Sequence, residues 1–198
     1  MQKIAAIGGK VLESTAQAVE ATHVIASDGV ESIRRTPKLM IALCKTSNIV
    51  SIAWLDDSAR KRKALSTSDY LVLGDVEAER KYHFNMRQTL QNGDSLRQVG
   101  ETILNGRNVF VCKGVAGKRS PPEDELRLMI DAAGGIWIRD ASRLNRFRGE
   151  EALIITSDPP AEGQLTSKGV ANAVRKGIRH YSTSWLFNCL LSQEFKDK

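Results

Sequence analysis

The chain has 198 residues, 41% of them hydrophobic, and a formal net charge of +6. This length and apolar content suffice for one large or two small globular domains with real cores. No stretch approaches the ~20 apolar residues of a membrane span, and the N-terminus lacks the charged-then-apolar pattern of a secretory signal. We therefore expect no membrane partner, and the basic excess favours an acidic one, such as nucleic acid or a phosphorylated protein.

The cysteines and histidines indicate neither a metal site nor a catalytic site. Cys44, Cys112 and Cys189 are far apart and have apolar or strand-like neighbours, whereas zinc and redox sites use closely spaced pairs. The histidines are scattered as well. The segment "GVAGKRS" from Gly114 lacks the spacing of a nucleotide-binding phosphate loop. We predict an intracellular protein with reduced thiols that needs no metal or cofactor and is not an enzyme.

In the first part of the chain, predicted strands alternate with helices, which is typical of a parallel sheet covered by helices. The predicted elements are a Gly-Gly turn at 8–9, strands at 10–14 and 22–27, a helix from Pro37, a strand at 49–54 and a helix from about Leu55. Past Tyr70 the sequence becomes polar without a sustained apolar face. This stretch is therefore predicted to be a linker with room for a short helix.

The same order of elements returns after the linker. The predicted elements are a strand within 103–114, a helix at 121–135 with prolines at its start and glycines at its end, strands at 136–139 and 152–157, a helix at 166–177, and a strand leading into a Trp-bearing helix within 178–195. Gly134 and Gly135 match the first Gly-Gly pair, and Trp185 matches Trp54. We predict an internal repeat of domain size, with units at 1–73 and 103–198 and the linker at 74–102.

A run of cations surrounds the start of the predicted helix at Pro37. Arg34, Arg35 and Lys38 lie within five residues, next to the capping residue Thr36. The positive end of the helix dipole disfavours cations, so this arrangement favours the binding of an external anion.

The repeat resembles the BRCT domain, through the Gly-Gly turn after the first helix, the strand "THVIAS" and the Trp on the final helix. The two copies cover nearly the whole chain. The likeness extends to the C-terminal BRCT pair of the mediator of DNA-damage checkpoint family, in "IRRTPKLMIALCKTSNIVSIAWL", "SDYLV" and "NVFVCKGVAGKRSPP". The resemblance implies an α/β fold of two BRCT repeats. Each would be a small, four-stranded parallel β-sheet flanked by α-helices, and the two would pack in tandem through helices with a groove across their interface.

The resemblance also implies a function and its residues. The module would bind a phosphoserine near a protein C-terminus, as in the phosphorylated histone tail at DNA double-strand breaks, and would act in the nucleus as a checkpoint and repair mediator. Carried onto this sequence, Thr36 and Lys38 would hold the phosphate and Arg35 the terminal carboxylate. The interface pocket would be lined by Met40, Pro121 and Phe187.

The chain departs from the family at its start. In the family, a strand before the first helix ends in Ser or Thr followed by Gly, which contact the phosphate. Here the sequence opens with "MQKIAAIGG", which matches the first helix, so we expect the first strand of repeat one and its motif to be missing. Either this is a truncated version of the repeat, or its opening residues are rearranged. We expect the neighbouring strands to lose their ladder partner. We also expect weaker phosphopeptide binding than in a chain that carries the strand.

Two other functions remain open at the level of the sequence. The first is nucleic-acid binding, because some BRCT domains hold phosphorylated DNA ends and this chain is basic. The second is a protein-interaction scaffold that needs no phosphate. The basic run "ARKRKA" around 60–63 fits either a solvated helix face or a nuclear import signal.

Overall fold

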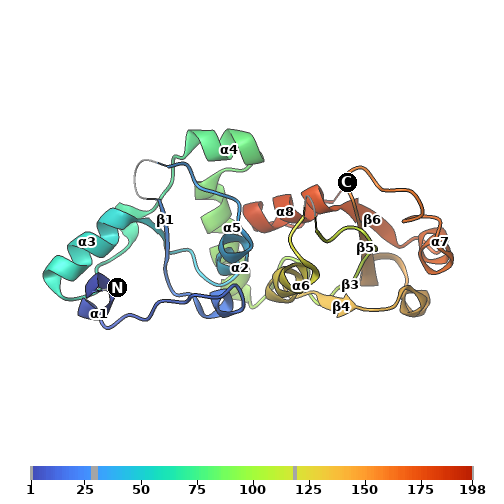
Figure 1. Cartoon of the computed structure of the whole chain (residues 1–198), viewed down its shortest axis with the longest axis horizontal. Helices are drawn as coiled ribbons and strands as arrows, with labels where there is room; N and C mark the ends of the chain where they lie inside the picture. Colours follow the sequence, from blue (N-terminus) through green and yellow to red (C-terminus); the bar gives the residue numbers. More distant parts are fainter. Residues whose placement is uncertain (1, 28–30, 118–119, 198) are drawn as a thin grey trace.

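The computed structural model describes residues 2–27, 31–117 and 120–197. In Figure 1 two similar α/β halves lie side by side along the long axis, with a helical segment near their junction. The first half contains α1 (Gln2–Ala6), η1 (Ala16–Glu20), β1 (Val24–Ser27), α2 (Pro37–Leu43), β2 (Ile49–Ser51), α3 (Ile52–Lys61) and η2 (Ser68–Tyr70). Between the halves lie α4 (Val76–Tyr82) and α5 (Met86–Val99).

The second half is built on a parallel sheet with strand order β4-β3-β5-β6. Its elements are β3 (Asn108–Val111), α6 (Glu123–Ala132), β4 (Ile136–Ile138), η3 (Ala141–Arg146), η4 (Gly149–Glu151), β5 (Ala152–Thr156), α7 (Lys168–Arg175), β6 (Arg179–Ser182) and α8 (Thr183–Ser192). All five residues of β5 are buried, as expected for a central strand covered on both faces. Figure 1 shows α6 and α8 on one side of the sheet and α7 on the other. The predicted order of strands and helices in this half is confirmed.

The first half has a smaller sheet than the resemblance implied. In the described residues, β1 pairs in parallel with β2, Val24 opposite Ile49, and no further strand joins β1. Residues 10–14, which we predicted to form a strand, are not in one. The second half supplies the physical reason, because β4 there joins the sheet only through β3. The described residues of the first half contain no counterpart of β3, so residues 10–14 have no strand edge there to pair with.

The predicted internal repeat is visible in matching hydrogen bonds. In each half a strand ends at a serine, Ser51 or Ser182, and the next helix begins at the following residue. A tryptophan lies three residues after each serine. The indole N–H of Trp54 donates to the carbonyl of the residue eleven positions ahead at 3.0 Å, and that of Trp185 does the same at 2.6 Å. Since α3 already begins at Ile52, the predicted strand at 49–54 is half strand and half helix.

The Gly-Gly turns also match between the halves. Gly8 and Gly134 have φ of +72° and +77°, in the left-handed region, and each closes the first helix of its half. Glycine reaches this conformation without strain. A Cβ at Gly134 would also come within 2.0 Å of the Thr102 hydroxyl, so this turn could not accept another residue without rearrangement.

Residues 74–102, predicted to be a linker, are largely helical. The 14-residue helix α5 buries Met86, Thr89, Leu90 and Gly93 and packs against α8. Two polar contacts join these helices, because Thr89 Oγ1 donates to the Leu191 carbonyl at 2.6 Å and Asn92 Nδ2 donates to the Ser192 carbonyl at 2.8 Å. The sequence pattern did not predict this helix, because half of its buried positions are Thr and Gly, which carry no hydrophobic signal.

The two halves share one core across a helical interface. Helix α2 of the first half packs against α6 and α8 of the second, as the resemblance implied. The core is continuous through residues from both halves, among them Leu39, Met40, Ile41, Leu126, Met129, Phe187 and Leu190. A separate small cluster centres on Val50, Trp54 and Leu55. Within the described part of the chain, none of the helices combines the length and apolar character needed to cross a bilayer.

Candidate functional site

Thr36 caps the start of α2 and keeps its hydroxyl at the surface. Its backbone is extended, with φ −110° and ψ 154°, and its Oγ1 accepts a hydrogen bond from the N–H of Leu39 at 3.2 Å. Pro37 occupies the first helical position, where its lack of an N–H costs nothing. Because a hydroxyl has one donor as well as acceptor lone pairs, capping leaves the Thr36 O–H available to an anion.

The backbone of α2 itself offers few donors to a ligand. The helix has only seven residues, Pro37 carries no N–H, and the N–H of Leu39 is used by the cap. The N–H of Met40 donates to the Thr36 carbonyl at 3.1 Å. An anion at this end of α2 therefore depends on side chains, rather than on the helix end as the sequence suggested.

Lys38 is exposed at the first turn of α2, where the helix has no acidic residue. Its ammonium donates to the backbone carbonyl of Glu13, in the segment that precedes η1. A neutral carbonyl at the surface is a weak partner for a cation compared with an oxyanion. A phosphate reaching this position would thus compete well for the Lys38 ammonium.

Arg35 points into the interface between the halves. Its guanidinium carbon lies 5.2 Å from the ring centre of Tyr82, at the end of α4, and 4.9 Å from that of Phe187, on α8. Partial burial lowers the pKa of Arg35 from its ordinary value, with Tyr82 acting in the opposite direction, and an arginine remains charged in either case. In the described residues Arg35 has no carboxylate partner, so its donors are available for an external one.

Asp75 fixes the segment that carries Arg35. Its carboxylate accepts from the Ser32 hydroxyl at 2.7 Å and from the Ile33 N–H at 2.6 Å, and it also caps α4 by accepting from the Ala78 N–H at 2.9 Å. Burial acts to raise the pKa of Asp75, but the hydrogen bonds from Ala78, Ile33 and Ser32 outweigh it and hold the pKa below its ordinary value of 3.8. One carboxylate therefore fastens the chain before Arg35 to the helix that carries Tyr82.

The three residues predicted to line the interface pocket lie at or near the interface, with different exposure. Phe187 is 5% exposed and presents its ring to Arg35. Met40 is 1% exposed and lies inside the shared core, so its side chain has no surface to offer a ligand. Pro121 is half-buried just before α6, and its carbonyl accepts from the Gly117 N–H at 3.4 Å.

Arg35 and Lys38 lie three residues apart but face different neighbours. Arg35 faces the second half and α4, whereas Lys38 faces the Glu13 segment. This arrangement suits a ligand with two separated anionic groups rather than one compact dianion. A phosphoserine and a terminal carboxylate three extended residues away are separated by about 10 Å.

Sequence reasoning missed Asp75 and Tyr82, because both lie in the segment assigned to the linker. One signal was present. Asp75 precedes "VEAERKY", so a capping residue is followed by acids in the first turn and bases in the last, which is the pattern of a helix start.

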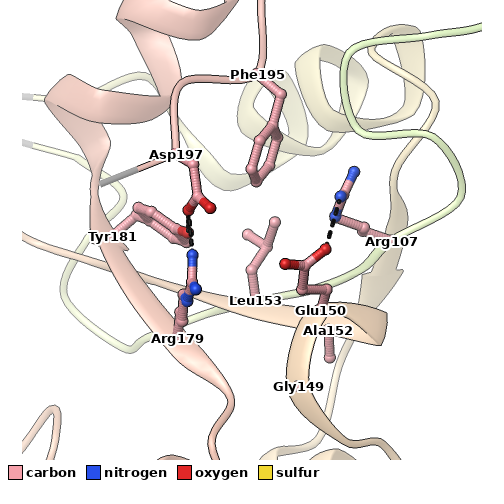
Figure 2. A pocket seen from close by; sticks show the side chains of 9 residues that line it. All are labelled: Arg107, Gly149, Glu150, Ala152, Leu153, Arg179, Tyr181, Phe195 and Asp197. Carbon is pink, nitrogen blue, oxygen red and sulfur yellow. Dashed lines mark hydrogen bonds and ion pairs between the residues drawn. The ribbon is translucent and has the colours of Figure 1, made fainter.

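The hollow in Figure 2 is already filled by side chains of the second half and leaves only about 10 Å³ of space. Arg179 pairs with Asp197, whose carboxylate also accepts from the Tyr181 hydroxyl at 3.2 Å. Arg107 lies 4.3 Å from the ring centre of Phe195. These contacts fasten the end of the described chain to the sheet, and the remaining space holds a water at most.

A larger hollow of about 310 Å³ lies between the α4–α5 corner and the end of α8. Its walls carry the carboxylates Glu79 and Glu194 beside Lys196. A lining that carries two acids and one lysine does not favour a phosphate. This hollow is therefore a poorer candidate than the start of α2.

Comparison with known proteins finds similar sequences, although no family model matches the chain. The chain is 29% identical over 193 residues to the mediator of DNA damage checkpoint protein 1 of Macaca mulatta, across 98% of this chain and 8% of that protein. It is 30% identical over 191 residues to the Rattus norvegicus protein of the same name, across 96% of this chain and 13% of that protein. The breast cancer type 1 susceptibility protein homolog of Rattus norvegicus is 26% identical over 155 residues, across 74% of this chain and 8% of its own length.

The chain thus spans about a tenth of the length of these relatives. Among solved structures, it is similar to the BRCT5-BRCT6 domains of S. pombe Brc1, with a TM-score of 0.72 and 17% identity. That match covers 98% of this chain and 87% of the other. The structural likeness shows the fold.

Proposed function

Because the chain folds as a tandem BRCT pair similar to that of the mediator of DNA damage checkpoint protein 1, we propose that it is a phosphopeptide-binding module of the DNA-damage response. It reads a phosphoserine close to a protein C-terminus. The observation that carries the proposal is the position of Arg35, which stacks on Phe187 of the other half next to the exposed Thr36 and Lys38.

In this proposal Lys38 and Thr36 hold the phosphate. A phosphoserine carries close to −2 charge and three acceptor oxygens, which match the ammonium and the free hydroxyl donor. Each charge-assisted hydrogen bond contributes about 1.5 to 3 kcal/mol, whereas a micromolar complex requires about 8 kcal/mol after the costs of ordering. The phosphate alone is therefore insufficient, and a second anchor is required.

Arg35 supplies the second anchor. Its planar guanidinium can bind a carboxylate through two parallel hydrogen bonds, and the rings of Tyr82 and Phe187 hold it in place. A terminal carboxylate offers this geometry, which favours a phosphoserine near a chain end. A phosphorylated histone tail at a DNA double-strand break is the partner we propose, and the nucleus is the compartment.

Titration of a C-terminal phosphoserine peptide tests the proposal. We expect binding that disappears when the peptide is dephosphorylated and when Lys38 is replaced by methionine. Lys38→Met should leave the fold intact, because Lys38 is exposed. Lys45→Met is the matched control, since Lys45 is an exposed lysine just after the same helix, and it should bind like the parent chain.

Other outcomes point to the other two functions. Equal affinity for the phosphorylated and unphosphorylated peptides would indicate a phosphate-independent scaffold. Peptide affinity that falls with salt concentration as steeply as the affinity of a nucleic-acid complex would indicate a general polyanion site. Either result contradicts the two-anchor proposal.

A further inference from the structure

The positive charge of the chain is concentrated in two stretches of the second half. Residues 139–148 and 168–176 together carry seven basic side chains and one acidic one, whereas the remaining 22 basic and 22 acidic residues balance. All seven basic side chains are exposed. We call this set the basic face: Arg139, Arg143, Arg146, Arg148, Lys168, Arg175 and Lys176.

The two stretches form one surface because η3 and α7 pack against each other. The ammonium of Lys176 donates to the Asn145 carbonyl at 3.0 Å. Helix α7 approaches η3 closely at Gly169, where an added Cβ would come within 2.8 Å of the Cβ of Ala141. Figure 1 places α7 at the end of the molecule opposite α1 and α3, with the sheet between it and α6 and α8. The basic face is therefore separate from the start of α2.

The charges of the basic face are not neutralised within the described part of the chain, where none of them forms an ion pair. The nearby acids have other partners. Asp140 caps η3, Glu150 lies 3.6 Å from Arg107, and Glu151 accepts from the backbone N–H of Arg148 at 2.8 Å.

The other basic run has a structural explanation. Residues 60–63 lie at the C-terminal end of α3, where the helix dipole favours cations. Arg60 pairs there with Asp57. This end of α3 is therefore a solvated and partly neutralised helix end, which the basic face is not.

We infer that the basic face binds the phosphate backbone of duplex DNA. Duplex DNA presents about one negative charge per 1.7 Å of its axis, so its charge is spread over a surface in the same way as these side chains. A membrane surface fits less well, because an interfacial helix needs an apolar face to bury in lipid. The apolar residues Val170 and Ala173 of α7 are instead buried, and Val174 is 36% exposed.

Anisotropy of a labelled duplex DNA, measured with the whole chain from about 50 to 200 mM salt, tests this inference. We expect the parent chain to bind the duplex more weakly as the salt concentration rises. The double variant Arg143→Gln with Arg146→Gln should show a slope of log K against log salt concentration that is smaller by about two. The matched control is Lys61→Gln with Lys63→Gln, which removes the same charge near the C-terminal end of α3, in the first half, and should keep the parent slope. Lys168→Gln on α7 should reduce the slope by about one.

Three outcomes would overturn the inference. The first is absence of DNA binding by the parent at about 50 mM salt. The second is an equal loss of DNA affinity in the Arg143/Arg146 variant and in the Lys61/Lys63 control. The third is binding to phosphatidylserine vesicles that depends on Arg143 and Arg146 in a chain that does not bind the duplex. Lys38→Met should retain full DNA binding. That variant separates failure of this inference from failure of the phosphopeptide proposal.

Discussion

The guanidinium carbon of Arg35, at the start of α2, lies 4.9 Å from the ring centre of Phe187 on α8. This contact joins the two BRCT repeats through a cation and an aromatic face. It places the donors of an arginine at the shared interface, next to the exposed residues that begin α2. The proposed binding of a terminal carboxylate depends on this position of Arg35.

Arg35→Lys should weaken binding of a C-terminal phosphoserine peptide by about ten- to a hundredfold, because a lysine cannot form the paired hydrogen bonds of a guanidinium. Calorimetric titration measures the change in affinity, with one peptide that ends in a free carboxylate and one whose C-terminus is amidated. The parent should prefer the free acid, and Arg35→Lys should lose that preference.

Arg34→Lys is the control for this experiment. Arg34 is the adjacent arginine, but its side chain is 75% exposed and pairs with Glu31 at the surface. The Arg34→Lys variant should therefore bind both peptides with the affinity of the parent. If the parent binds the amidated peptide as tightly as the free acid, the carboxylate role of Arg35 is wrong.

Thr36→Val should destabilise the chain by about 1 kcal/mol, because the N–H of Leu39 loses its capping acceptor. It should also weaken phosphopeptide binding through the lost hydroxyl donor. Urea unfolding and peptide titration measure the two effects. Thr36→Ser keeps the hydroxyl and should retain both properties, so a Ser variant as defective as Val would contradict this account.

Asp75→Asn should destabilise the chain by about 1 to 3 kcal/mol at neutral pH, because one carboxylate accepts hydrogen bonds from Ser32, Ile33 and Ala78. The folded-state pKa of Asp75 lies below 3.8. Its stabilising effect is therefore present above that value and is lost as the pH falls through the lower, folded-state pKa.

Urea unfolding of both proteins at several pH values measures this dependence. The difference in the free energy of unfolding between the parent and Asp75→Asn should shrink below about pH 4. Taking the difference removes the effect of other carboxylates. A difference that stays constant down to the acid transition would show that ionised Asp75 does not hold this segment.

Met40 provides a test of burial against ligand contact. Met40→Ala should destabilise the chain by about 2 to 5 kcal/mol through a cavity in the shared core. Met40→Leu conserves volume and should cost less than about 1.5 kcal/mol. Because the Met40 side chain is almost fully buried, Met40→Leu should leave peptide affinity unchanged. A large loss of affinity at parent stability would place Met40 in the pocket after all.

Much of the fold follows from local patterns in the sequence. Three elements could be predicted because each depends on neighbouring residues alone. They are the buried strand at 152–156, the helix from Glu123 with its prolines and glycines, and the Trp-bearing last helix of each half. The repeat could be predicted because the two halves keep the same order of elements, with a Gly-Gly pair and a tryptophan at matching places in the sequence. Helix α5 could not, because polar residues of the linker are buried only when α8 lies against them.

The sequence by itself determined the two similar α/β halves and the group of cations around Thr36, because helix periods, turn residues and charge are local properties. Only the tertiary structure decided which side chains meet. It stacked Arg35 on Phe187, fastened its segment to Asp75, buried Met40, and left residues 10–14 outside a sheet. These outcomes depend on contacts between residues far apart in the chain, and the energies of such contacts are not written in any local pattern.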